Sequence, residues 1–138
     1  MIKLGVNSVL FGGYDFETAC KYISLAGYDG LEISAIKGMC EHLMPDDWKS
    51  QENMLKETME KYNLAFLATE VASLDEDRLT KTFEACQALG IPIVNIGPGG
   101  KSNVKEDMPI LIDKLIRLSQ KAKSYGVTLC CKAHVGAV

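Results

Sequence analysis

Short apolar runs alternate with longer amphipathic stretches along the chain, and a glycine or asparagine stands between most helical stretches and the apolar run that follows. This order is typical of strands that alternate with single helices. Five strands are expected, at residues 2–7, 30–34, 65–69, 93–96 and 127–132. Four helices are expected between them, at residues 15–26, 46–62, 73–89 and 109–125.

Capping residues mark the expected helix ends. Asp46 or Asp47 can cap the second helix, and Ser73 with Glu76 three residues later forms a capping-box pattern for the third. Gly90 follows the last apolar position of that third helix and is expected to end it.

Short apolar strands joined by single helices predict parallel pairing with right-handed crossovers, so the fold class is α/β. Two architectures fit this pattern: the first four and a half units of a TIM-type (β/α)8 barrel, or an open five-stranded flavodoxin-like sheet. The length of 138 residues favours the open sheet. The sequence ends just beyond the fifth strand with no further helix, which favours the barrel portion. Residues 1–138 are therefore expected to form one domain, an incomplete barrel.

Composition and charge limit the binding partners and the cellular location that are expected for this protein. With 15 Lys and Arg against 18 Asp and Glu, the net charge of −3 gives no basic field for nucleic acid. No run approaches the length of a membrane span, and the start lacks the pattern of a signal peptide, so a cytoplasmic location is expected. Five cysteines without a CxxC pair are expected to be reduced thiols.

Polar residues recur where the expected strands end. Because parallel strands bring their carboxyl ends to one edge, these side chains are expected to share a ligand-binding rim. They are Asn7, Ser8, Glu32, Glu70, Asn95, Lys132 and His134.

Three of these rim residues carry the clearest chemistry. Glu32 lies between two apolar residues, so its side chain faces the opposite side of the strand from theirs and needs a partner, in a functional site or in a structural ion pair. Lys132 and His134 are two positions apart on an extended segment and face the same side. A cation beside an imidazole can bind hydroxyl groups or phosphate, or hold an enolate oxyanion.

The second histidine, His42, lies in a loop of about a dozen residues that is expected to act as a lid or substrate loop. Cys40 stands nearby, but no further residues complete a four-ligand metal site at a recognisable spacing. The segment GPGG at residues 97–100 matches neither common phosphate-binding pattern, and a turn is the simpler interpretation.

Three segments together resemble the sugar phosphate isomerase/epimerase family, which has the xylose isomerase-like TIM barrel. They are KLGVN at residues 3–7, AGYDGLEI at residues 26–33, and YGVTL followed by KAHVG at residues 125–129 and 132–136. The passage AGYDGLEI is also shared by related endonucleases and dehydratases, so the resemblance indicates a superfamily better than it indicates a reaction. It implies the amino-terminal part of such a barrel.

The resemblance also implies a site. Members of the family commonly hold a divalent metal such as Mn²⁺ or Mg²⁺ with carboxylates and a histidine from later strands, and paired glutamates move a proton between adjacent sugar carbons. The matching position at the fifth strand is a glutamate in the family and Lys132 here, which argues against a metal. Glu32 and His134 match positions that the family uses near its substrate, while Glu70 and Asn95 match only as strand ends.

The leading hypothesis is therefore a sugar or sugar-phosphate isomerase or epimerase. In it, Glu70 is the base and Lys132 stabilises charge in place of a metal. The residues expected to orient substrate hydroxyls are Asn7, Glu32, His42, Asn95 and His134. The alternatives are a non-catalytic binding or assembly module that forms homo-oligomers through its open sheet edges, and a relative of endonuclease IV-like repair enzymes.

Overall fold

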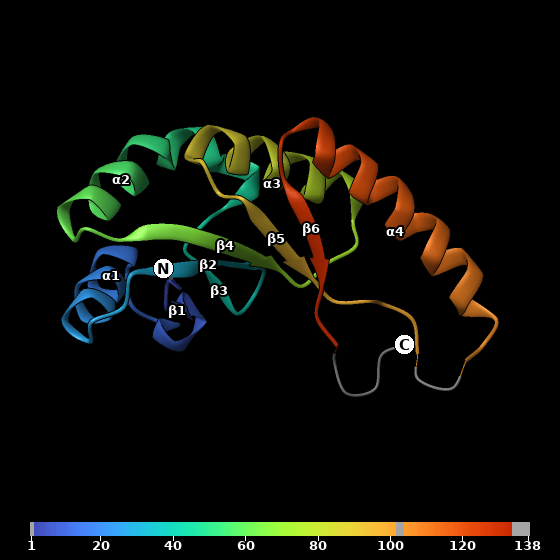
Figure 1. Cartoon of the computed structure of the whole chain (residues 1–138), viewed down its shortest axis with the longest axis horizontal. Helices are drawn as coiled ribbons and strands as arrows, with labels where there is room; N and C mark the ends of the chain where they lie inside the picture. The colour runs from blue at the N-terminus through green and yellow to red at the C-terminus, as the bar shows by residue number, and fades with distance from the viewer. Residues whose placement is uncertain (1, 102–103, 134–138) are drawn as a thin grey trace.

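The computed structural model describes residues 2–101 and 104–133 (Figure 1). Its elements in chain order are β1 (Gly5–Asn7), η1 (Ser8–Phe11), α1 (Phe16–Leu25), β2 (Gly30–Ile36), β3 (Cys40–Glu41), η2 (Pro45–Asp47), α2 (Trp48–Lys61), β4 (Ala65–Val71), α3 (Glu76–Leu89), β5 (Ile93–Ile96), α4 (Asp107–Ser124) and β6 (Thr128–Cys131). None of the helices in the described ranges is both long and apolar enough to cross a lipid bilayer.

The strands follow one another across the sheet in the order in which they occur in the chain. Within the described residues the order is β1-β2-β4-β5-β6, with every pair parallel, and the short strand β3 pairs antiparallel with β2. A flavodoxin-like sheet would place its first strand between the second and third, so that alternative is wrong. Sequential parallel order is the order of a barrel wall, and the predicted barrel portion is confirmed.

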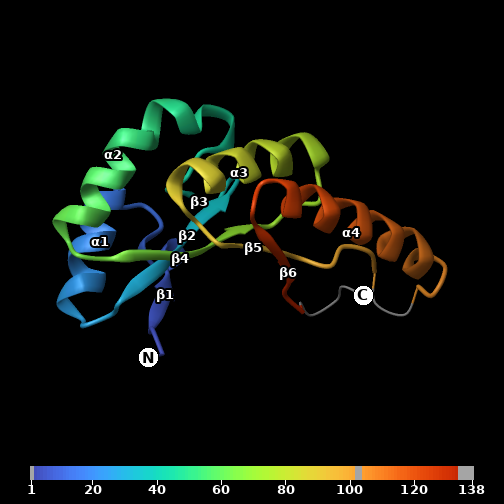
Figure 2. The same ribbon diagram turned by 45° about the horizontal axis from the view of Figure 1, so that its top comes forward.

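The helices form one continuous layer against the sheet. Consecutive helices touch, α1 against α2, α2 against α3, and α3 against α4. Figures 1 and 2 show α2, α3 and α4 side by side on one side of the twisted strands. A doubly wound sheet would carry helices on both faces, whereas a barrel carries them only outside.

The hydrophobic core lies between the sheet and this helical layer. Strand residues that face the helices are fully buried, and so are the apolar stripes of the helices. Examples are Leu31, Ile33, Val94 and Ile96 from the strands and Ile23, Leu55, Leu79, Phe83 and Leu118 from the helices. Burying each such side chain stabilises the fold by about 1.5–3 kcal/mol. Cys20 and Cys86 belong to this core, and burial raises the pKa of each thiol to about 12.

On the opposite face of the sheet, Leu67 packs against two glycines. The register shifts between Leu31 and Glu32, so that Leu67 is the extra residue of a bulge in β4. A Cβ at Gly5 would collide with Cδ1 of Leu67, and a Cβ at Gly30 would collide with the carbonyl oxygen of Ala65. The absence of side chains at both positions therefore lets β1, β2 and β4 approach closely beneath the rim.

Some helix ends and one strand differ from the expectation. Asp75, rather than Ser73, caps α3 by accepting a hydrogen bond from the N–H of Arg78 at 2.8 Å. Asp47 stands at the N-cap position of α2, as expected, but its side chain accepts the hydroxyl of Ser50 rather than a backbone N–H. Strand β3 was not expected, because two residues are too short a run for periodicity to reveal.

The glycine contacts predict different outcomes for two substitutions. Gly30→Ala should lower the free energy of unfolding by about 1–3 kcal/mol, because its Cβ meets backbone that cannot move aside. Gly5→Ala should also destabilise the protein, but the nearest obstacle is the end of the Leu67 side chain. Urea unfolding of both variants measures the two losses.

Adding Leu67→Ala separates the collision with a side chain at Gly5 from the collision with the backbone at Gly30. In a Leu67→Ala background, Gly5→Ala should cost less than it does alone, whereas Gly30→Ala should remain destabilising. Equal recovery of both variants would show that side-chain crowding, rather than backbone contact, governs Gly30.

Candidate functional site

Five polar side chains from neighbouring strands meet at the carboxyl edge of the sheet. They are Asn7 at the end of β1, Glu32 in β2, Glu70 in β4, Asn95 in β5 and Lys132 directly after β6. The N–H of Lys132 donates to the carbonyl oxygen of Ile96 at 2.8 Å, which extends the β5–β6 pairing to this residue. We call this group of five side chains the rim cluster.

Hydrogen bonds join the whole rim cluster. Glu32 accepts the side-chain amide of Asn95 at Oε1, and at Oε2 it accepts Asn7 at 2.7 Å and Lys132 at 3.0 Å. Glu70 accepts the same amide of Asn7 at Oε2, which also lies 3.0 Å from the ammonium of Lys132. One ammonium and one amide therefore bridge the two carboxylates.

The electrostatics of the rim cluster depend on Lys132. The side chains of Glu32 and Glu70 are only 16% and 12% exposed, and two carboxylates this buried need a nearby cation. Burial by itself lowers the pKa of Lys132, but its hydrogen bonds to Glu32 and Glu70 outweigh this effect and raise the pKa above the usual lysine value. Lys132 is therefore a cation at neutral pH.

Glu70 keeps one oxygen available. Its Oε2 accepts from Asn7 and Lys132, whereas no donor among the described residues bonds its Oε1. Both oxygens of Glu32 are already occupied. Of the two carboxylates, Glu70 is thus the one with an oxygen that accepts no hydrogen bond from the described residues, and this oxygen can accept a proton from a ligand.

His42 follows β3, and its described hydrogen bonds go to residues outside the rim cluster. Its Nε2 lies 3.0 Å from the carbonyl oxygen of Tyr14 and therefore carries the proton, while its Nδ1 accepts the hydroxyl of Ser8 at 2.9 Å. Ser8 Oγ in turn accepts the N–H of Ser34, two residues after Glu32. His42 is buried, and the segment around it is a packed hairpin rather than an open loop.

The structure brings together five of the candidate residues in the rim cluster. Those that meet are Asn7, Glu32, Glu70, Asn95 and Lys132. His42 contacts Ser8 instead, and His134 lies outside the described residues.

Sequence reasoning missed a buried arginine. Arg78, in the first turn of α3, pairs with Glu41 of β3 at 2.7 Å and donates to the carbonyl oxygen of Ala35 at 2.8 Å. It also lies 3.3 Å from Asp46. No pattern in the sequence marks Arg78, because its partners come from β2, β3 and η2. It ties the hairpin that holds His42 to α3.

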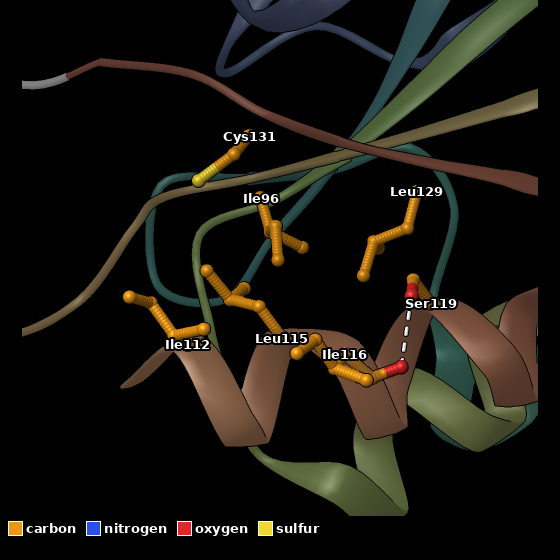
Figure 3. A pocket seen from close by; sticks show the side chains of 7 residues that line it. All are labelled: Ile96, Ile112, Leu115, Ile116, Ser119, Leu129 and Cys131. Carbon is orange, nitrogen blue, oxygen red and sulfur yellow. Dashed lines mark hydrogen bonds between the residues drawn. The ribbon is translucent and has the colours of Figure 1, made fainter. Parts of the chain in front are cut away.

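An apolar cavity of about 290 Å³ lies on the helix-facing side of the sheet (Figure 3). Its lining side chains come from β5, β6 and α4, and they are Ile96, Ile112, Leu115, Ile116, Ser119, Leu129 and Cys131. The hydroxyl of Ser119 is already bonded to the carbonyl oxygen of Ile116 at 2.8 Å. With no charged group in its wall, this cavity lacks the chemistry of the rim cluster.

The rim cluster does not fit a divalent metal. Among the described residues no three His, Cys, Asp or Glu side chains stand close enough together to hold one. Two carboxylates do meet, but the ammonium of Lys132 lies 3.0 Å from each and offers no lone pair. Within the part of the chain that the structure describes, the rim cluster by itself therefore does not supply the ligands of a divalent metal.

Searches with the sequence found no matching family model and no similar curated protein. Solved structures, however, match the fold over nearly the whole chain. A xylose isomerase-like TIM barrel protein from Mycobacterium smegmatis in complex with magnesium aligns with a TM-score of 0.74 and 13% identity, over 94% of this chain and 54% of that one. The IolI protein with a bound zinc atom aligns with a TM-score of 0.71 and 22% identity, over 99% and 54%.

A D-allulose 3-epimerase from Methylomonas sp. aligns with a TM-score of 0.69 and 17% identity, over 94% of this chain and 51% of that one. The chain thus spans about half the length of these three structures. The described residues therefore form part of a (β/α) barrel. More particularly, the chain has the fold of about half of a xylose isomerase-like TIM barrel, which confirms the fold that the resemblance implies.

Removing the ammonium of Lys132 should destabilise the protein. Lys132→Met leaves two largely buried carboxylates without a cation and should cost about 1–2 kcal/mol, less than for a fully buried pair because Lys132 is about a third exposed. Urea unfolding at pH 7 measures this loss. Lys123→Met, at an exposed lysine, is the matched control and should change stability by less than about 0.5 kcal/mol.

The stability lost in Lys132→Met should become smaller at high pH. Because the folded pKa of Lys132 is raised, its contribution is complete below the usual lysine value of 10.5 and disappears as the pH rises through the folded pKa. The difference in stability between wild type and Lys132→Met should therefore shrink above that value. A difference that stays constant up to pH 12 would mean that Lys132 acts by packing rather than by charge.

His42→Ala should destabilise the fold, because it leaves the Ser8 hydroxyl and the Tyr14 carbonyl without their partner. The expected cost is about 1–3 kcal/mol for each orphaned group that stays buried. Met39→Ala, at an exposed position of the same hairpin, should be nearly neutral. If His42→Ala instead keeps full stability and weakens sugar binding, the expected substrate-binding role of His42 is supported.

Proposed function

We propose that this protein is a sugar isomerase or epimerase that moves a proton between adjacent carbons of a hydroxy-carbonyl substrate. The observation that carries the proposal is the rim cluster, in which a carboxylate with a free oxygen, an ammonium and two amides face one edge of the sheet. These are a base, a charge stabiliser and donors for hydroxyl groups.

The solved structures with the same fold favour a sugar as the substrate class. One is a D-allulose 3-epimerase in complex with D-allulose, and another is a D-tagatose 3-epimerase-like protein. Both align at less than 20% identity, so they support the choice of substrate to test rather than the activity itself.

The chemistry needs no external redox partner. Oε1 of Glu70 takes the proton from the carbon beside the carbonyl, and the electrons of that C–H bond form the carbon–carbon double bond of an enediolate. The carbonyl oxygen becomes an oxyanion, which the ammonium of Lys132 stabilises after exchanging one of its carboxylate contacts for it. Glu70 then returns the proton to the neighbouring carbon, and a hydroxyl proton moves between the two oxygens.

The remaining residues of the rim cluster position the substrate. Asn7, Glu32 and Asn95 are fixed to one another by hydrogen bonds and present polar groups toward the same edge. Held in this way, they can bind the hydroxyls of a polyol with little loss of side-chain entropy. A single base on one side of the substrate gives isomerisation, whereas epimerisation needs a second proton donor on the opposite face.

Glu70→Gln should abolish proton transfer. The native polypeptide that carries this sequence is incubated in D₂O with a panel of ketoses and aldoses, and NMR follows deuterium entry at the carbon beside the carbonyl. Glu70→Gln should slow exchange by about 10²- to 10⁴-fold, because the amide cannot accept the proton. Glu57→Gln, on the exposed face of α2, is the matched control and should leave the rate unchanged.

Two results would contradict the proposal. One is exchange that persists at the wild-type rate in Glu70→Gln. The other is the absence of exchange with every sugar of the panel; if the polypeptide still bound polyols, the alternative of a non-catalytic binding module would be favoured. That alternative also accounts for β1 and β6, which each pair with a single strand within the described residues.

A further inference from the structure

The negative charges of the rim cluster are partly compensated by a side chain of the protein, and this bears on metal dependence. Glu32 and Glu70 contribute two negative charges, and Lys132 contributes one positive charge 3.0 Å from an oxygen of each. Asn7 donates to both carboxylates and Asn95 donates to Glu32. The point between the two glutamates where a cation is best stabilised is therefore taken by a side chain of the protein itself.

A divalent cation at that point would have to displace the ammonium. While the ammonium stays, it repels the cation at short range, and it offers no lone pair as a ligand. Displacing it would move Lys132 off two largely buried carboxylates and lose two charge-assisted hydrogen bonds. Two of the solved barrels that share this fold are described with a bound zinc atom or magnesium, so metal binding is a property worth testing in this chain.

We infer that the ammonium of Lys132 takes the place of a divalent cation at this rim, so that Glu32 and Glu70 are organised by an internal lysine and take up Mn²⁺ or Mg²⁺ poorly. The inference rests on the proposed function for its catalytic meaning, namely that the enediolate oxyanion is stabilised by an ammonium. Its structural part concerns cation binding alone.

One substitution should therefore convert the rim cluster into a metal-binding site. Lys132→Glu removes the repelling charge and places a third carboxylate beside Glu32 and Glu70, which supplies the oxygen ligands that Mn²⁺ prefers. Lys132→Met removes the charge without adding a ligand and is the matched control. The difference in Mn²⁺ affinity between wild type and Lys132→Met measures the effect of removing the charge. The difference between Lys132→Met and Lys132→Glu measures the effect of the added carboxylate.

The test is calorimetric titration of the chain with Mn²⁺ alone. Lys132→Glu should bind Mn²⁺ about tenfold or more tightly than wild type, with Lys132→Met in between. Adding Glu32→Gln to Lys132→Glu should reverse the gain. Binding by wild type as tight as by Lys132→Glu, and lost in Glu32→Gln, would overturn the inference.

A second measurement does not depend on the folding of any variant. Titrating wild type with Mn²⁺ in an NMR tube should leave the side-chain amide signals of Asn7 and Asn95 sharp at micromolar metal, because the ion does not approach them. Selective broadening of these two signals would refute the inference. Both experiments measure binding without turnover, so their outcome is independent of whether the deuterium exchange expected of Glu70 is found.

Discussion

The site depends on one interaction, the ammonium of Lys132 held between Glu32 and Glu70. Two mostly buried carboxylates on strands that pair directly would repel each other, and a single cation placed between them converts that repulsion into attraction. Lys132 follows β6, which is two strands away from β4. The ion pairs therefore tie the last described strand to the first half of the sheet, and the site forms only when β6 is in place.

The barrel-type strand order makes this meeting possible. Parallel strands in sequential order bring their carboxyl ends to one edge, and the curvature of the sheet turns the side chains of that edge toward a common point. The site also requires that β1, β2 and β4 approach one another closely below the rim. Gly5 and Gly30 leave room for Leu67, so that β1, β2 and β4 pack tightly beneath Asn7, Glu32 and Glu70.

The inferred replacement of a metal by Lys132 would change what the site can do. An ammonium carries one charge and three donors on a flexible stem, whereas a divalent cation carries two charges and fixes its ligands in a defined geometry. The lysine needs no uptake of an ion, but it stabilises an oxyanion less strongly. Asn7 and Asn95 compensate in part, because their amides fix the carboxylates that hold Lys132.

From the sequence alone, five parallel strands alternating with four helices could be predicted, because apolar periodicity and glycines act locally. The rim position of Asn7, Glu32, Glu70, Asn95 and Lys132 could also be predicted, because strand ends converge in any parallel sheet. The sequence favoured the barrel portion over the open sheet, and only the observed strand order excluded the open sheet, because that choice depends on which strands pair. Strand β3 and the cap at Asp75 were also seen only in the structure. The burial of His42 could not be predicted, because its hydrogen bonds to Ser8 and Tyr14 join residues that are distant in the chain. The contact of Lys132 with Glu32 and Glu70 could be known only from the fold, because the fold brings Lys132 to a glutamate that lies 100 positions earlier in the chain.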